Sequence, residues 1–215
     1  MNNKIDWKNI IEYYNTIKSL YIECEESDPE LKTNLQPLNE FRAAFDHLMR
    51  IIAIQNLSEY QNEDCSKQVE KLWSHLRRAY YDICDMLSIN YRNKIIDMLK
   101  IYTSDEIMKV MPEYYSQIRP DIENMSSRIC QLRNNKNFNK QNEIANCEEY
   151  QQIVFKLKDY YKIISSKNSS LVEIHKETLF LNKKNKKSKI LYQIVIPVAG
   201  IVIGAIIGII GFFCK

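Results

Sequence analysis

Glycine is the residue that most constrains this chain, because all four glycines lie among the last sixteen of its 215 residues. The first 199 residues therefore lack the glycine-rich loops that build nucleotide-binding folds and the nucleophile elbow of α/β-hydrolases. Tight β-hairpins also depend on glycine. Hydrophobic residues make up 45% of the chain, which is enough for a buried core. The sequence thus predicts an all-α protein with one domain of ordinary size and an appendage.

The six cysteines give no sign of a metal or redox site. No two of them form a CxxC pair, and no histidine lies at metal-ligand spacing from any of them. We therefore expect no metal, no cofactor and reduced thiols, as in a cytosolic domain. The chain opens with MNNKIDWKNI, which has no apolar core and so predicts no signal peptide. The net charge of +3 is too small to indicate nucleic-acid binding by itself.

Apolar and aromatic residues recur every three or four positions over most of the chain, as in amphipathic helices. Pro29 and Pro37 indicate a loop after the first helix. The expected helices span about 6–24, 38–57, 66–87, 104–112 and 121–133, and a stretch over 91–101 continues or follows the third. We expect a helical bundle over 1–133, followed by a polar linker over 134–142.

A longer helix is expected over 143–182. From Tyr150 to Leu181 the apolar spacing alternates between three and four residues, which is a heptad pattern. Lys167 and the polar residues after it are poor seam residues. Two interpretations stay open: a coiled-coil helix that self-associates, or a single amphipathic helix packed on the domain. Either helix would lead directly towards the C-terminal segment.

The C-terminal segment over 190–213 is an uncharged run of 24 residues. Such a run is long enough to cross a hydrocarbon core of about 30 Å, so it predicts a single transmembrane helix that anchors the chain. The basic run over 183–189 predicts a cytoplasmic N-terminal domain and contact with lipid head groups. Its lysines are Lys183, Lys184, Lys186, Lys187 and Lys189. The glycines form a smooth stripe suited to close helix packing, at Gly200, Gly204, Gly208 and Gly211.

Two polar segments, 37–50 and 71–82, are expected to form an antiparallel helical hairpin within 37–89. On the register that the short loop suggests, Arg42 lies near Asp82, and Arg50 lies beside Trp73. The same register brings Asp46 and His47 close to the segment from His75 to Arg78. One interpretation is a polar network that fixes the pairing of the two helices. The other is a catalytic or ligand-binding cluster, in which histidine moves protons and arginine stabilises phosphate charge.

Residues 42–47 read RAAFDH, an arginine and a histidine separated by four residues on an expected helix. This motif resembles the signature of the HEPN superfamily, helical bundles that include many prokaryotic toxin and antiviral ribonucleases. The resemblance implies that Arg42 and His47 of two protomers meet at a dimer interface and cleave RNA without a metal. A HEPN-like bundle with a hydrophobic segment also resembles membrane-bound accessory proteins of CRISPR systems, which are implicated in membrane disruption.

Three functions remain open for an all-α helical bundle whose long C-terminal helix leads into a single transmembrane helix. The first is a membrane-anchored, self-associating effector of prokaryotic antiviral defence that assembles in or disrupts membranes. The second is a membrane-tethered, metal-independent HEPN ribonuclease. The third is a tail-anchored trafficking protein that resembles a SNARE. The expected partners are membrane lipid, further copies of the chain, and RNA or another defence protein.

Overall fold

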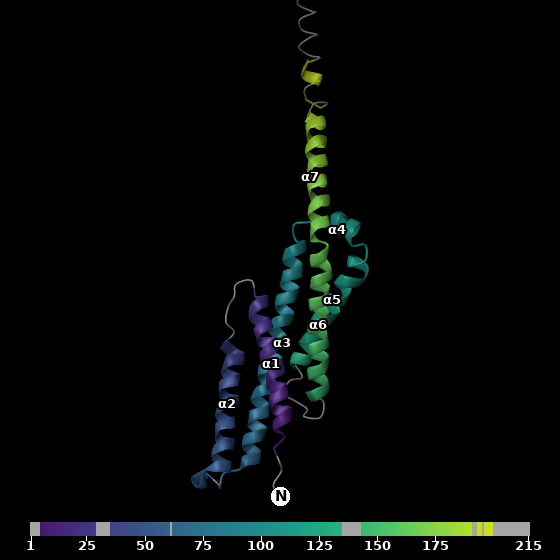
Figure 1. Ribbon diagram of the computed structural model, residues 1–215. Helices are drawn as coiled ribbons and strands as arrows, with labels where there is room; N and C mark the ends of the chain where they lie inside the picture. The colour runs from purple at the N-terminus through teal and green to yellow at the C-terminus, as the bar shows by residue number, and fades with distance from the viewer. Residues whose placement is uncertain are drawn as a thin grey trace, which may run out of the picture. The chain divides into compact units, whose positions relative to one another are not determined.

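The computed structural model describes residues 5–28, 35–60, 62–134, 143–190, 193–194 and 196–199 (Figure 1). The longer elements among them are α1 (Trp7–Ser27), α2 (Leu35–Asn56), α3 (Cys65–Leu99), α4 (Ser104–Val110), α5 (Arg119–Asn134), α6 (Glu143–Ser166) and α7 (Asn168–Ile190). Two shorter elements are the 3-10 helix η1 (Ser58–Tyr60) and the π-helical turn η2 (Tyr114–Ile118). Every element in these described ranges is helical, so the all-α prediction is confirmed.

Side chains that accept hydrogen bonds from the first backbone amides begin several of these helices. Asp6 caps α1 and Asp64 caps α3, each accepting from the amide three residues on, at 3.1 and 3.2 Å. Thr103 and Glu106 form a capping box at the start of α4. Such caps satisfy amides that have no partner inside the helix. The starting points of these helices are therefore specified locally by the sequence.

Helix α3 has 35 residues and merges two segments that the sequence presents separately, 66–87 and 91–101. The buried stripe continues without interruption across the join, at Leu87, Tyr91, Ile95 and Leu99. These residues follow one another at steps of four, which keeps them on one face of a continuous helix. The apolar spacing therefore continues through the polar residues at the join, and the two segments form one helix of 35 residues.

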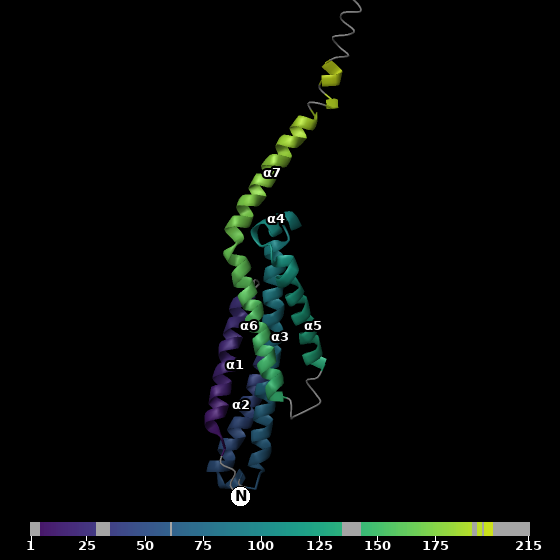
Figure 2. The same cartoon turned by 90° about the vertical axis from the view of Figure 1, so that its right-hand side faces the viewer.

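The chain divides into two compact units. The first comprises residues 1–101 and 113–166, and the second comprises 102–112 and 167–215. In the first unit, α1, α2 and α6 each pack against α3, as Figures 1 and 2 show from two sides. Its core includes fully buried side chains from all four helices, such as Ile17, Ile51, Leu87 and Leu157. The central position of α3 explains why its buried stripe is the longest.

A buried acidic side chain ties three helices of the first unit together. Asp85 of α3 accepts a hydrogen bond from the hydroxyl of Tyr150 on α6 and pairs with Nε of Arg133 on α5 at 3.2 Å. The Asp85 side chain is only 9% exposed. A buried carboxylate requires such partners, because an unpaired charge inside a protein is strongly destabilising.

In the second unit, α4 packs against α7. Glu106 of α4 is 1% exposed, and its Oε1 lies 3.0 Å from Nδ1 of His175 on α7. The ring of Tyr102 meets the His175 ring edge to face at 5.5 Å, and the Tyr102 hydroxyl donates to Asn168. A small polar and aromatic cluster thus joins the short helix to the long one.

The prediction that the fold includes a single transmembrane helix is wrong for the part of the chain that the structure describes. None of the helices found there combines the length and the apolar character that crossing a bilayer requires. The reason lies in the composition of α7, which carries lysines up to Lys189, while 193–194 and 196–199 form only short helical pieces. Residues 191–192, 195 and 200–215 lie outside the described residues, and so do the four glycines of the predicted packing stripe.

The helix expected over 143–182 is divided at Lys167, between α6 and α7. The side chains of α6 at Tyr150, Val154 and Leu157 are buried in the core of the first unit. This burial is the arrangement that the second interpretation of the heptad pattern describes, a helix packed on the domain. The lysines over 183–189 whose side chains are described are exposed: Lys183, Lys184, Lys186 and Lys189.

Candidate functional site: a histidine pair between α2 and α3

Helices α2 and α3 run antiparallel, and two histidines meet at the seam between them. The rings of His47 on α2 and His75 on α3 stack with their centroids 5.2 Å apart and their planes 19° apart. The other polar members of the cluster are Glu40 on α2 and Gln68 and Arg78 on α3. Both helices are well packed here, so the rings are held by rigid elements rather than by loops.

Each histidine is oriented by a side chain from the opposite helix. Nδ1 of His47 lies 2.8 Å from Oε1 of Gln68, and Nδ1 of His75 lies 2.7 Å from Oε2 of Glu40. Both oxygens are acceptors, so both Nδ1 atoms donate. In the neutral form of each ring, Nε2 is then the nitrogen that accepts a proton. The two rings therefore have the same preferred tautomer.

Burial and charge differ across the cluster. The side chains of His75 and Glu40 are 18% and 19% exposed, and Gln68 is buried. Arg78 is more than half exposed, with Nη1 3.8 Å from Oε2 of Glu40 and Nη2 donating to Ser74 at 3.0 Å. The histidines are therefore partly screened from water, whereas the guanidinium of Arg78 faces it. A ligand phosphate has access to this guanidinium.

Glu40 and Gln68 were missed by sequence reasoning, although the sequence carries a signal for both. Glu40 precedes His47 by seven residues, and Gln68 precedes His75 by seven residues. Seven residues are close to two helical turns, so each pair lies on one face of its helix. Because the helices are antiparallel, each histidine reaches the polar residue that lies two turns before the other histidine.

The other residues of the predicted polar network are placed differently. Asp46 accepts from Nε of Arg50 at 3.1 Å on the exposed face of α2, away from the histidine pair. Asp82 of α3 is half-buried. Trp73 has the ring of Tyr13 as its neighbour, at 5.4 Å, and no contact between Arg50 and Trp73 occurs among the described interactions.

Arg42 and His47 do not form one site within the chain. Arg42 is exposed and lines an apolar groove, whereas His47 faces α3. Five residues on an α-helix correspond to a rotation of about 140°, which separates the two side chains around α2. Among the described residues Arg42 makes no ion pair or hydrogen bond, and in particular none to Asp82.

The thiols do not contribute a nucleophile to this site. None of the five cysteines within the described ranges is in a disulfide. Burial raises the pKa of the Cys24 thiol to about 12, which keeps it in the unreactive thiol form. The described residues also contain no group of three or more histidine, cysteine, aspartate or glutamate side chains able to hold a metal ion.

The chain matches no family model, and searches of curated proteins and of solved structures find no match either. The resemblance to the HEPN superfamily thus depends on the motif at 42–47 and stays a prediction. What the chain does must be inferred from the chemistry of its own residues.

Proposed function

We propose that this chain cleaves RNA without a metal, with His47 and His75 as the proton-transferring pair. The observation that carries the proposal is the stacked histidine pair, in which both Nδ1 atoms are engaged by polar side chains. Imidazole groups gain and lose protons near neutral pH, which suits them to general acid–base catalysis. Of two such groups side by side, one can take the proton from the attacking oxygen and the other can give a proton to the leaving oxygen in one displacement at phosphorus.

In the proposed reaction one imidazole Nε2 removes the proton from a ribose 2′-hydroxyl. The 2′-oxygen then attacks phosphorus, and the bond from phosphorus to the 5′-oxygen breaks. The second imidazole, protonated at Nε2, gives its proton to the departing 5′-oxygen. The products are a 2′,3′-cyclic phosphate and a 5′-hydroxyl, and the two histidines finish with their protonation states exchanged.

Three neighbours have supporting roles in this proposal. Arg78 lies one turn after His75 and supplies positive charge for the phosphate oxygens as the charge on them grows. Glu40 and Gln68 are positioning residues, because they act by fixing the tautomer and orientation of the rings. Arg42, which the motif at 42–47 nominates as catalytic, has no part in the reaction on this geometry.

The test is RNA cleavage by the full chain in the presence of a metal chelator. His47→Asn and His75→Asn should each lower the rate by roughly 10²- to 10⁴-fold, the range found for general acid–base groups. His175→Asn is the matched control, since this histidine lies in the second unit and should leave the rate unchanged. The wild-type rate should show a bell-shaped dependence on pH, because one ring must be neutral and the other protonated.

Two results would overturn the proposal. One is cleavage that persists in both α2–α3 histidine variants, and the other is a wild-type chain that is folded and inactive on RNA. A loss of thermal stability in the two variants, without any RNA cleavage by the wild type, would identify the pair as a structural network. Gln68→Leu separates the roles further, since a positioning residue should alter the pH profile more than the affinity for RNA.

The biological setting remains a prediction. A role in prokaryotic antiviral defence, self-association and a cytoplasmic N-terminal domain are suggested by the sequence and are not needed for the cleavage proposed. The SNARE-like alternative gains no support from the described residues, where α6 is buried against the bundle along the positions that a SNARE helix would offer to partners.

A further inference from the structure

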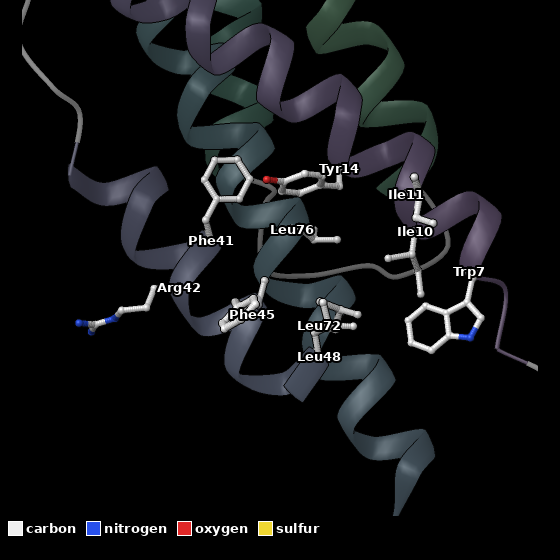
Figure 3. A pocket seen from close by; sticks show the side chains of 11 residues that line it. Trp7, Ile10, Ile11, Tyr14, Phe41, Arg42, Phe45, Leu48, Leu72 and Leu76 are labelled. Carbon is white, nitrogen blue, oxygen red and sulfur yellow. The ribbon is translucent and has the colours of Figure 1, made fainter. Parts of the chain in front are cut away.

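A groove of about 610 Å³ lies between α1 and α2, with α3 as its floor. Figure 3 shows apolar and aromatic side chains from the three helices turned towards it. The two helices that form its walls pack against α3, and the lining reaches Trp7 at the start of α1 and Leu48 within α2. A groove of this volume falls within the range of sites that bind one small ligand.

Nearly all of the lining is apolar, and much of it is exposed. Ile11 and Phe45, on opposite walls, are 56% and 60% exposed. The residues that line the groove are Trp7, Ile10, Ile11, Tyr14, Phe41, Arg42, Ala44, Phe45, Leu48, Leu72 and Leu76. Arg42 is the charged member of this set.

Aromatic contacts close one end of the groove. The ring of Phe41 on α2 meets Tyr14 and Tyr21 of α1 edge to face, at 5.8 and 6.0 Å. These contacts bring the two walls together at that end. Because one end is closed, the groove does not suit a helix that would lie along its whole length. It suits a slender occupant that enters from the Trp7 end.

Among the residues that the structure describes, Arg42 has no carboxylate partner. It lies one turn before Asp46, but Asp46 accepts from Nε of Arg50, one turn further on. In Figure 3 the Arg42 guanidinium extends outward while the apolar side chains face the groove. Because the side chain is exposed, a change of rotamer is fast and moves its charge along the rim. The rim thus offers one cation above an apolar floor.

We propose that this groove binds a free long-chain fatty acid. The unbranched tail would lie against Trp7, Phe45 and Leu72, and the carboxylate would pair with Arg42. A single acyl chain suits the volume and the closed end, and its one negative charge complements the one lining cation. The site is separate from the histidine pair, so it stands or falls independently of RNA cleavage.

The experiment uses the position of Trp7, since the chain has two tryptophans. In the full-length Trp73→Phe variant, fluorescence comes from Trp7 alone. Titration with stearic acid that carries a nitroxide on its chain should quench this emission saturably. In the reciprocal Trp7→Phe variant the emission of Trp73, which does not line the groove, should stay unquenched.

The role of Arg42 is tested by competition. Unlabelled stearic acid should displace the labelled acid at about fivefold lower concentration than stearyl alcohol does. The reason is that an exposed ion pair contributes up to about 1 kcal/mol. Arg42→Gln should remove this difference without weakening alcohol binding. Arg119→Gln is the matched control and should keep it, since this exposed arginine of α5 does not line the groove.

Three results would overturn the proposal. They are an unquenched Trp7, equal competition by acid and alcohol in the Trp73→Phe protein, and a preference for the acid that survives in Arg42→Gln. A Trp7 emission maximum that shifts with protein concentration in the absence of fatty acid would show that a second copy covers the groove, and this would also refute a free fatty acid as its occupant.

Discussion

The buried carboxylate of Glu106 should make α4 sensitive to acid. Its Oε2 accepts from the backbone N–H of Thr103 at 2.7 Å, and its Oε1 lies 3.0 Å from Nδ1 of His175. The hydrogen bond from the Thr103 amide, against the opposing effect of burial and with help from His175, lowers the pKa of Glu106 to about 2. The substitution that tests this is Glu106→Gln, which keeps the shape of the side chain and removes its charge.

The magnitude follows from the pKa. A carboxyl group whose pKa falls from 4.5 to about 2 on folding stabilises the folded state by roughly 3 kcal/mol. Because the folded pKa is the lower one, this stability is present above pH 4.5 and is lost as the pH falls towards 2. Glu106→Gln should therefore destabilise α4 by roughly 3 kcal/mol at pH 5 and by less than about 1 kcal/mol at pH 2.5.

Native-state hydrogen exchange is the appropriate assay, because the chain has two units and a global transition would average them. The amides to follow are Ile107 and Met111, which donate within and at the end of α4 to Thr103 and Ile107 at 3.0 and 2.8 Å. Their opening free energies, corrected for intrinsic exchange, are compared between pH 5 and pH 2.5. This window lies below the range in which histidine ordinarily titrates.

A matched control separates this carboxylate from charge at the helix N-terminus in general. Asp105 is the neighbouring acid in the same first turn, and it is exposed. Asp105→Asn should change the opening free energy by about 0.5 kcal/mol at most. If the effect of Glu106→Gln were the same at pH 5 and pH 2.5, the charge of Glu106 would not be what stabilises α4, and the reasoning would fail.

The remaining predictions concern the first unit and are read from urea unfolding followed by circular dichroism. Leu87→Ala removes a fully buried side chain of α3 and should cost about 2 to 5 kcal/mol. Asp85→Ala should cost about 1 to 3 kcal/mol, since it leaves the buried hydroxyl of Tyr150 unpaired while Arg133 stays half exposed, and Tyr150→Phe should cost about 1 to 2 kcal/mol. Lys156→Met removes an exposed ion pair with Asp121 and should cost less than about 1 kcal/mol. If Asp85→Ala and Lys156→Met had equal costs, the ranking of these interactions by burial would be wrong.

Most of the fold prediction was based on the helical spacing of apolar residues. Most buried positions of α3 fall on the apolar stripe that the sequence displays, and α4 begins at residue 104, as expected. Periodicity cannot say whether two helical stretches join, so the sequence left open whether 91–101 continues the third helix, and the structure shows that it does up to Leu99. Hydrophobicity alone also led to a transmembrane helix that the described part of the chain does not contain.

The side chains that matter for tertiary contacts were harder to predict. Asp85 is flanked by apolar residues, and nothing local shows that its partners come from α5 and α6, at Arg133 and Tyr150. A similar limit applies to Glu106, whose partner His175 lies 69 positions along the chain. Sequence spacing describes one helix at a time, whereas a buried carboxylate depends on which helices meet.

The histidine pair is the case in which spacing and tertiary structure can be combined. Glu40 and His47 share one face of α2, and Gln68 and His75 share one face of α3, both at two turns. Two helices with this pattern, packed antiparallel, can satisfy both histidines only in the register in which each meets the other's polar residue. A register shifted by one turn would leave a partly buried imidazole without its partner, which costs about 1 to 3 kcal/mol. The same hydrogen bonds that fix the tautomers for catalysis therefore also select the pairing of α2 with α3, so the structural and catalytic interpretations of this cluster are compatible rather than exclusive.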